Sequence, residues 1–345
     1  MDFSRLPGAL LPWYQQNKRD LPWRQDKEPY HVWLSEIMLQ QTRVEAVKSY
    51  YARFLSELPT ISHLASCDDE RLHKLWEGLG YYSRVRNLKK CAQVLMNEYG
   101  GAFPRTLKEV QSLPGIGPYT AGAICSICFD LPTPAVDGNV LRVVSRLLAE
   151  ETPIDSPAFQ KKIRAALAEI YPAQAGDFTQ ALMELGATLC GPNRAPDCKN
   201  CPCKGFCRAA QMGTVQNFPV KTQKKPRRLE EMTLFVLSYD GKIALEKRPN
   251  KGLLAGLWQF PNTSGTLSVS QALAYLESLG LSPRELKRQL QKNHIFTHIQ
   301  WDMTGFYLEV NKPIPAYTWL SPDEIDANIP LPTAFKQFWE ERNHV

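Results

Sequence analysis

Long apolar runs are missing from this chain. No stretch approaches the roughly 18 apolar residues that a membrane-spanning helix needs, so we expect no transmembrane segment. The opening residues, MDFSRLPGALLPWYQQ, lack the basic flank and apolar centre of a secretory signal. Internal repeats and low-complexity tracts are also missing. These absences predict an intracellular, cytoplasmic protein (nucleoid-associated if it is bacterial) that does not bind a membrane.

The excess of one sign of charge is also small. A net charge of +6 over 345 residues favours an anionic partner only mildly, because many proteins with no nucleic-acid role carry as much. The composition, with 43% hydrophobic and 22% charged residues, is typical of a folded soluble protein. The length suits two domains of roughly 100–200 residues each.

Cysteines are few in most of the chain but crowded at one place. Five of the nine lie within residues 190–207, and four of these have the spacing Cys190-x7-Cys198-x2-Cys201-x5-Cys207. In an intracellular chain such clustering indicates a metal site rather than disulfides. The spacing alone leaves open whether the metal is a [4Fe–4S] cluster or a Cys₄ zinc ion.

The hydrophobic pattern divides the chain into an all-α part and an α+β part. Residues 1–212 show helical periodicity, with caps and prolines between segments such as VWLSEIMLQQTRVEAVKSYYARFLSEL and SRVRNLKKCAQVLMNEY. Residues 213–230 form a basic linker without periodicity. In residues 231–345, β-rich runs flank Asp240-Gly241, which predicts a hairpin, and SQALAYLESLG and TAFKQFWEER predict helices.

A glycine-rich turn stands directly before a strongly apolar helix. In LPGIGPYTAGAICSICF, Gly115 and Gly117 flank Ile116, and Pro118 is a favourable first residue for the helix. The free amides at such a helix start can bind an anion, and DNA phosphate is the obvious one because no P-loop pattern is found. An ordinary connector between two helices is the alternative.

Two carboxylates are candidates for chemistry. Asp137 precedes an amphipathic helix in VDGNVLRVVSRLL, where an ordinary helix cap is the alternative. Glu36 has Val32, Trp33 and Leu39 as helical neighbours, so burial should raise the pKa of its carboxyl. A buried, ion-paired glutamate is the alternative there.

Together these motifs resemble one family. LPGIGPYTAGA followed by VDGNV is similar to the helix-hairpin-helix and Gly/Pro…Asp motif of the endonuclease III superfamily of DNA glycosylases. LPWR (21–24), PYHVWLSEIMLQQT (29–42), GLGYYSRVRNL (78–88) and FTH (296–298) resemble MutY-type adenine DNA glycosylases. The resemblance covers nearly the whole chain.

The resemblance implies removal of adenine mispaired with 8-oxoguanine or guanine from double-stranded DNA, by a monomeric enzyme. Glu36 would protonate the flipped adenine, and Asp137 would stabilise the positively charged sugar. The apolar surroundings of Glu36 and the polar helix start at Asp137 should drive the two pKa values apart. The positions that match supporting residues of the active site are Tyr119, Asn139 and Arg24.

Other matched positions would contact DNA or discriminate between related enzymes. Tyr119 stands where bifunctional relatives carry a Schiff-base lysine, so the resemblance implies hydrolysis without strand cleavage. Gln41 and Tyr81 match residues that wedge beside the 8-oxoguanine, although a core aromatic is the alternative for Tyr81. The hairpin residues expected at the DNA are Leu113, Gly115, Ile116 and Gly117.

The resemblance also bears on the cysteines and on the second domain. It favours a [4Fe–4S] cluster on Cys190, Cys198, Cys201 and Cys207, although the family usually has six residues in the first gap. The additional seventh residue in this gap is expected to enlarge the loop that carries Arg194. The longer gap also leaves open whether Cys203 competes as a ligand.

GLLAGLWQFP (252–261) is similar to a Nudix-type fold, but the following helix lacks the Glu-rich metal-binding pattern of the hydrolases. A binding module is therefore expected, in which Phe296, Thr297 and His298 check the 8-oxoguanine; a plain β-turn is the alternative. Two other functions stay open: another glycosylase of the superfamily, such as a thymine-mismatch enzyme, or a non-enzymatic DNA-binding protein that carries the cluster.

Overall fold

The computed structural model describes residues 3–192, 195–223 and 226–342. It divides into two compact units, of which one comprises Met1–Cys67 and Arg86–Gln223 and the other Asp68–Val85 and Lys224–Val345. Each unit is described by itself below. No helix within the described residues is both long and apolar enough to cross a lipid bilayer.

The first unit is built from helices, as the periodicity predicted. The long periodic stretch from Val32 to Leu58 is not one helix, because Gln41 adopts a left-handed backbone (φ 58°) that interrupts it. The helices that belong to this unit are α1 (Leu6–Asn17), α2 (Pro29–Leu39), α3 (Val44–Glu57), α4 (Ile61–Ser66), most of α6 (Ser83–Tyr99), α7 (Leu107–Ser112), α8 (Pro118–Phe129), α9 (Gly138–Leu148), α10 (Pro157–Ala168), α11 (Ala175–Thr188) and α12 (Arg208–Gln211), with 3-10 turns η1 (Pro22–Arg24), η2 (Lys204–Phe206) and η3 (Val215–Asn217).

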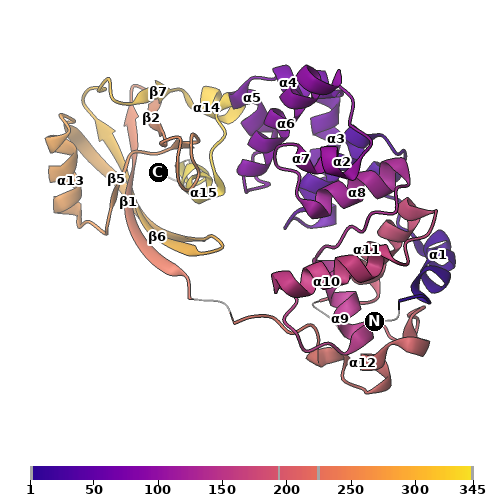
Figure 1. The fold of residues 1–345 in the computed structure, drawn as a ribbon. Coiled ribbons are helices and arrows are strands. Elements are labelled where there is room, and N and C mark those ends of the chain that lie inside the picture. Colours follow the sequence, from indigo (N-terminus) through magenta and orange to yellow (C-terminus); the bar gives the residue numbers. More distant parts are fainter. Residues whose placement is uncertain (1–2, 193–194, 224–225, 343–345) are drawn as a thin grey trace. The chain divides into compact units, whose positions relative to one another are not determined.

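Helix α8 is the buried centre that the apolar run after the glycine turn predicted. Its residues Thr120–Ile127 are all buried, and α8 packs against α2, α7 and α11 (Figure 1). A second cluster packs α1, α9, α10 and α11 around Phe178 and Leu182. Burial on nearly all sides is consistent with the absence of charged residues from α8.

The turn between α7 and α8 has the tight geometry that its glycines indicated. Gly115 has a φ of +75°, and a Cβ at this position would lie 2.6 Å from the Cβ of Asn87. Ile116 is buried, as expected, whereas Gly117 lies in extended backbone and faces open space. The turn therefore requires glycine at 115 for both conformation and space, and at 117 for neither.

The second unit contains a mixed sheet between helices. The strand order is β3-β2-β1-β6-β5, with β4 on β1 and β7 on β2, and β1 runs parallel to β6. Its elements are β1 (Arg228–Tyr239), β2 (Lys242–Lys247), β3 (Trp258–Gln259), β4 (Asn262–Ser264), α13 (Val269–Ser278), β5 (Pro283–Ile295), β6 (Ile299–Val310), β7 (Thr318–Leu320), α14 (Pro322–Asn328) and α15 (Thr333–Trp339).

Alternation along β1 sends side chains into two apolar layers. Leu234 and Val236 enter the layer beneath α14 and α15, and Phe235 and Leu237 enter the layer beneath α13. α13 and α15 cover opposite faces of the sheet (Figure 1).

The predicted hairpin is confirmed: Tyr239 pairs with Lys242, and Asp240 and Gly241 both have positive φ, as a type I′ turn requires. The helix predictions for residues 270–280 and 333–342 are confirmed within a few residues.

One short segment lies with the second unit although its sequence neighbours belong to the first. Asp68–Val85, which includes α5 (Asp69–Leu75), packs against α14 and the chain that follows it. The predicted bounds, 1–212, 213–230 and 231–345, follow composition along the chain. Because this association is a tertiary contact, no local pattern signals it, and the predicted bounds stay a prediction.

We predict that Gly115→Ala lowers the free energy of unfolding of the helical unit by ~1–3 kcal/mol, because alanine is strained at this φ and its Cβ would collide with Asn87. Gly117→Ala is the matched control, since the added Cβ meets no atom within 4 Å. Urea denaturation followed by far-UV circular dichroism measures both. Equal stabilities for the two variants would contradict this explanation of the turn.

Candidate active site and cysteine pocket

The carboxyl of Glu36 is buried, as its neighbours predicted. Glu36 lies on α2 with 6% of its surface exposed, and it accepts a hydrogen bond from the hydroxyl of Tyr119 on α8. Burial raises its pKa from 4.5 to about 7, and the nearby charge of Asp137 adds to the rise; the Tyr119 hydrogen bond and the charge of Arg24 oppose it. Glu36 can therefore carry a proton near neutral pH.

Asp137 is the N-cap of α9 and a neighbour of Glu36. Its Oδ1 accepts from the backbone N–H of Val140 at 2.7 Å, and its Oδ2 accepts from Nδ2 of Asn139 at 2.7 Å. Burial raises the pKa of Asp137, against these hydrogen bonds and the charge of Arg142. Both pKa values are therefore raised, because the polar helix start is itself desolvated, and the expectation that the two values are driven apart stays a prediction. The ordinary-cap interpretation is correct as geometry and compatible with a catalytic role.

A third carboxylate, Glu184 on α11, was missed from the sequence. It is fully buried, and it forms ion pairs with Nε of Arg19 at 2.6 Å and with Nη2 of Arg24 at 2.7 Å. Burial acts to raise the pKa of Glu184, but the two guanidinium groups lower it overall. Glu184 therefore fixes the side chain of Arg24, which the resemblance placed among the supporting residues of the active site. Its signal in the sequence is a single acid in an apolar helix, ALMELGA.

A chain of hydrogen bonds leads from Asp137 along α9 to the cysteine segment. Asn139 bonds to Asp137 through Nδ2 and accepts through Oδ1 from Nη2 of Arg142, at 2.8 Å. Arg142 also donates to the carbonyls of Gly186 at 2.7 Å and Cys190 at 2.8 Å. The buried arginine therefore connects the candidate catalytic carboxylate to the first cysteine. Its sequence signal is an arginine on a buried face, and the motifs did not include it.

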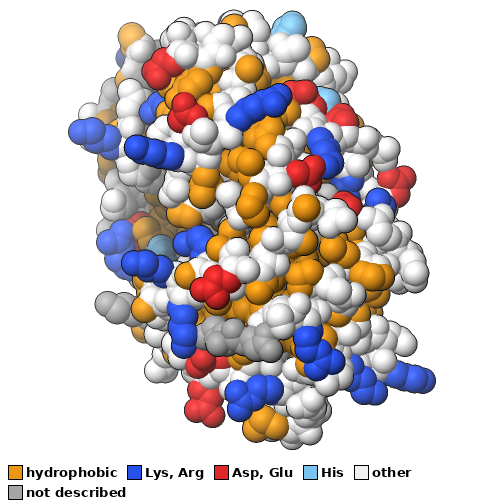
Figure 2. All heavy atoms as spheres, turned by 45° about the vertical axis from the view of Figure 1, so that its right-hand side comes forward, with side chains coloured by type: hydrophobic (Ala, Val, Ile, Leu, Met, Phe, Trp, Pro, Cys, Tyr) orange, Lys and Arg blue, Asp and Glu red, His pale blue; other side chains and the backbone are white. Residues whose placement is uncertain are grey.

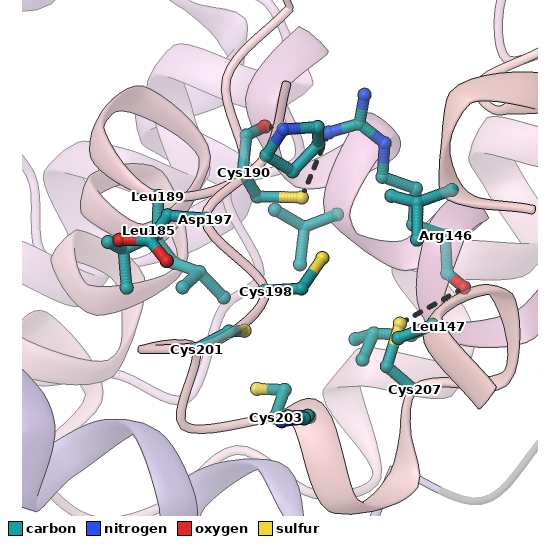
Figure 3. Close-up of a pocket in the computed structure, with 15 residues that line it drawn as sticks. Arg146, Leu147, Leu185, Leu189, Cys190, Asp197, Cys198, Cys201, Cys203 and Cys207 are labelled. Carbon is teal, nitrogen blue, oxygen red and sulfur yellow. Dashed lines mark hydrogen bonds between the residues drawn. The ribbon is translucent and has the colours of Figure 1, made fainter. Parts of the chain in front are cut away.

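The clustered cysteines line one pocket with about 390 Å³ of space. Figure 3 shows the sulfur atoms of Cys190, Cys198 and Cys207 turned toward the same open space, with Cys201 and Cys203 at its lower edge. Most of the other lining residues are apolar, Leu147, Leu185 and Val215 among them, and the charged ones are Arg146, Asp197 and Lys204. Arg194, on the enlarged first gap, lies outside the described residues.

Arg146 is buried against this pocket. Its Nη1 donates to the sulfur of Cys190 at 3.1 Å and to the carbonyls of Cys190 at 3.0 Å and Gly191 at 3.2 Å, and its Nε donates to the carbonyl of Phe218 at 3.0 Å. None of these partners is charged unless the cysteines are thiolates. Because a buried cation is costly without a counter-charge, Arg146 is suited to a pocket with anionic sulfur.

The structure does not by itself form a metal centre. Among residues 3–192, 195–223 and 226–342, no three His, Cys, Asp or Glu side chains lie close enough together to hold an ion. A hydrogen bond between the thiols of Cys201 and Cys203 lowers the pKa of Cys201 and raises that of Cys203. The cysteines present therefore have the right donor chemistry and share one pocket, but their sulfurs are not gathered.

The predicted DNA-contacting residues of the helical unit divide into two kinds. Leu113 and Ile116 are buried, so only their backbone can reach a partner, whereas Gly115 and Gly117 are exposed. Gln41 is exposed and holds a left-handed backbone. Figure 2 shows Lys and Arg side chains spread around a broad hydrophobic area rather than gathered in one patch. On that face charge alone does not mark a DNA-binding surface.

The predicted recognition residues of the second unit lie together. Tyr81 is 47% exposed, so the core-aromatic interpretation is wrong, and its hydroxyl lies 3.0 Å from the hydroxyl of Thr297. Phe296 packs edge-on against Trp301, with the ring centroids 4.8 Å apart. Thr297 and His298 are exposed in the turn between β5 and β6. The structure therefore places the wedge candidate beside the candidate lesion-checking turn.

Comparisons with known proteins agree with this architecture. Residues 34–172 match the HhH-GPD superfamily of base excision DNA repair proteins, and residues 232–341 match the NUDIX domain. The human adenine DNA glycosylase is 39% identical over 385 aligned positions, which cover 92% of this chain and 70% of the human protein.

Solved structures match the helical part of the chain. A thermostable thymine-DNA glycosylase is 28% identical with a TM-score of 0.54, and the match covers 59% of this chain and 94% of that protein. A trapped endonuclease III–DNA covalent intermediate is 23% identical with a TM-score of 0.52, and the match covers 62% of this chain and 99% of that protein. The second likeness shows a shared fold.

Glu36→Gln should change how stability depends on pH. The folded-state pKa of about 7 lies above the ordinary 4.5, so the neutral carboxyl contributes stability that is full below about pH 4.5 and is lost as the pH rises through about 7. Because glutamine stays neutral, the free energy of unfolding of the variant, relative to wild type, should rise between pH 5 and pH 8. Denaturation at several pH values measures this. With exposed Glu45→Gln as the control, an identical pH dependence in wild type and Glu36→Gln would contradict the buried neutral acid.

Proposed function

We propose, since the chain belongs to the adenine DNA glycosylase family, that it releases adenine mispaired with 8-oxoguanine or guanine in double-stranded DNA and leaves the strand uncut. Membership makes it a base-excision repair enzyme that acts on N-glycosyl bonds. The mispair and the absence of strand cleavage are the proposed part. The single observation that carries the chemistry is the buried Glu36 with the half-buried Asp137 near it, and with Tyr119 donating to Glu36.

The two carboxyls supply different parts of one reaction. The bond between the sugar and adenine breaks, its electron pair goes to the base, and the proton of Glu36 neutralises the leaving adenine. Positive charge then develops on the sugar, where the Asp137 carboxylate, held by Asn139 and the Val140 amide, stabilises it until water adds and loses one proton to the solvent. Both pKa values are raised, but three residues near Asp137, namely Asn139, Val140 and Arg142, oppose the rise and favour its ionised form.

Strand cleavage would need an amine that forms a Schiff base with the sugar. The hydroxyl of Tyr119 takes the place of that amine and is committed to Glu36. Burial and the neighbouring Glu36 and Asp137 raise its pKa well above 10, so it stays a neutral hydrogen-bond donor. Tyr119 therefore supports hydrolysis alone.

Recognition of 8-oxoguanine is assigned to the second unit. Tyr81 is exposed beside Thr297, and the sheet that carries Thr297 belongs to the NUDIX-matching region. The hydroxyl pair offers donors and acceptors next to an aromatic ring, which suits a modified base that must be both stacked against and hydrogen-bonded. The loss of the Glu-rich helix is consistent with a module that binds a base without hydrolysing a nucleotide.

A [4Fe–4S] cluster is the proposed cofactor, held by Cys190, Cys198, Cys201 and Cys207. Thiolate ligands, an apolar pocket and a buried arginine that donates to Cys190 fit an anionic iron–sulfur centre. When bound, the cluster would crosslink the segment that follows α11. It supplies no step of base release.

Single-turnover base release from duplexes that contain adenine opposite 8-oxoguanine, adenine opposite guanine, or thymine opposite guanine tests the substrate. We expect adenine release fastest opposite 8-oxoguanine, with no strand cleavage before alkali treatment. Release of thymine instead would favour the thymine-mismatch alternative. Binding without any release would favour the non-enzymatic one.

Glu36→Gln and Asp137→Asn should each slow adenine release by about 10²-fold or more while duplex binding persists, because each variant keeps the shape and removes the proton donor or the charge. The same assay with a filter-binding measurement separates the two effects. Glu45→Gln, on the exposed face of α3, should release adenine as wild type does. Near-wild-type release by Glu36→Gln would contradict its role as acid.

Iron and acid-labile sulfide analysis tests the cofactor and its ligands. Purified protein should hold about four iron atoms per chain, and Cys198→Ser should lose most of them. Cys203→Ser, at the edge of the same pocket, is the matched control and should keep its iron. One zinc per chain, or iron loss only in Cys203→Ser, would contradict the assignment.

A further inference from the structure

The segment Asp68–Val85 is held on the second unit by charged groups. On its helix α5, Lys74 donates through Nζ to the carbonyl of Ile329, which ends α14, at 3.0 Å. Lys74 is only 16% exposed at its side chain, so its charge needs a counter-charge nearby. Glu77, one turn further along the segment, supplies it at 2.8 Å.

Glu77 is the acid at the centre of this contact. Its carboxylate is 11% exposed and binds Nζ of Lys74 through one oxygen and Nζ of Lys336, on α15, at 3.3 Å through the other. One largely buried acid therefore bridges the segment to α15. A second pair, Glu70 with Lys247 on β2, joins the same two parts at 2.5 Å, but it is about half exposed. Solvent weakens the second pair far more than the first.

The turn that follows Glu77 presents Tyr81 in a constrained backbone. Gly78, Gly80 and Tyr81 all have positive φ (95°, 70° and 47°), and for tyrosine this conformation is unfavourable. The indole N–H of Trp76 donates to the carbonyl of Gly80 at 3.1 Å. Arg84 donates to the carbonyls of residues 79 and 80, at 2.8 and 3.0 Å. The turn is therefore preformed by its own hydrogen bonds. Its position on the second unit depends on the contacts made near its two ends, by Glu77 and by Tyr81.

Tyr81, the last residue of the preformed turn, contacts one of the candidate lesion-checking residues. The Tyr81 hydroxyl lies 3.0 Å from Thr297, on the turn between β5 and β6. Both side chains are exposed, so this single hydrogen bond in solvent cannot fix their separation. The contact of the largely buried Glu77, four residues before Tyr81, can fix the separation of the two side chains.

We propose that Glu77 is a positioning residue for mispair recognition, which ties the Trp76–Tyr81 turn to α15 so that Tyr81 and Thr297 meet DNA as one preorganised surface. This rests on the proposed function, because it assumes that these two side chains read 8-oxoguanine. Preorganisation removes the ordering cost from the recognition step. Loss of Glu77 should therefore weaken discrimination between 8-oxoguanine and guanine rather than the chemistry of adenine release.

The test compares adenine release opposite 8-oxoguanine with release opposite guanine, under single-turnover conditions with subsaturating enzyme. Glu77→Gln keeps the side-chain shape and removes the charge. We expect it to lower the 8-oxoguanine/guanine ratio by about fivefold, the size expected of coupling between groups in one network. Lys336→Gln should act in the same direction, but less, because Lys74 remains on Glu77. Glu70→Gln, which removes the exposed pair between the same two parts, is the matched control and should keep the wild-type ratio.

Amide hydrogen exchange of residues 76–82 in the DNA-free protein gives a second readout. Glu77→Gln should exchange faster there than wild type or Glu70→Gln, while α8 and α9 keep their protection, which also shows that the variant is folded. If Glu77→Gln is misfolded, Lys336→Gln, at a 41% exposed side chain, carries the same comparison.

Faster exchange with an unchanged ratio would overturn the recognition role, as would an unchanged ratio with unchanged exchange. If wild type itself released adenine equally opposite both bases, the proposed function and this inference would fail together. A wild-type preference that Glu77→Gln retains overturns the inference alone.

Discussion

Removal of water from the Glu36 carboxyl is the constraint on which the active site depends. Burial between α2 and α8 favours its neutral form, and Tyr119 and Arg24 restrain that effect, so that the pKa settles at about 7. The buried α8 supplies Tyr119, and the glycine turn allows α8 to begin close to α6. Glu184 holds Arg24 in place. Each of these features is needed because the pKa of a desolvated carboxyl is determined by the few groups that surround it.

Helix α9 is a scaffold shared by the carboxylate site and the cysteine pocket. Asp137 caps its start, and Arg142 and Arg146, one and two turns further on, hold the backbone and sulfur of Cys190. A four-residue spacing places both arginines on one face of the helix. The position of Asp137 therefore depends on the segment after α11, and a cluster bound there would stiffen the same helix. This gives the proposed iron–sulfur centre a structural purpose that needs no electron transfer.

Local sequence patterns predicted the features that depend on interactions between residues close together in the sequence. The turn at Gly115, the hairpin at Asp240-Gly241 and the burial of Glu36 follow from φ preference and helical spacing, and the structure shows each of them. Glu184 and the attachment of Asp68–Val85 to α14 and α15 could not be predicted, because their partners lie 160 or more residues away in the sequence. The raised pKa of Asp137 was not predicted either, because a polar cap motif carries no information on how strongly the carboxyl is desolvated.

The pH dependence of single-turnover adenine release tests the central claim most directly. If Glu36 must be protonated and has a pKa of about 7, the rate should fall about tenfold per pH unit as the pH rises above that value. Substitution of Tyr119 by phenylalanine removes a hydrogen bond that lowers this pKa, so the fall should move to higher pH. A rate that stays level to pH 9, or a fall that does not move in Tyr119→Phe, would contradict the account.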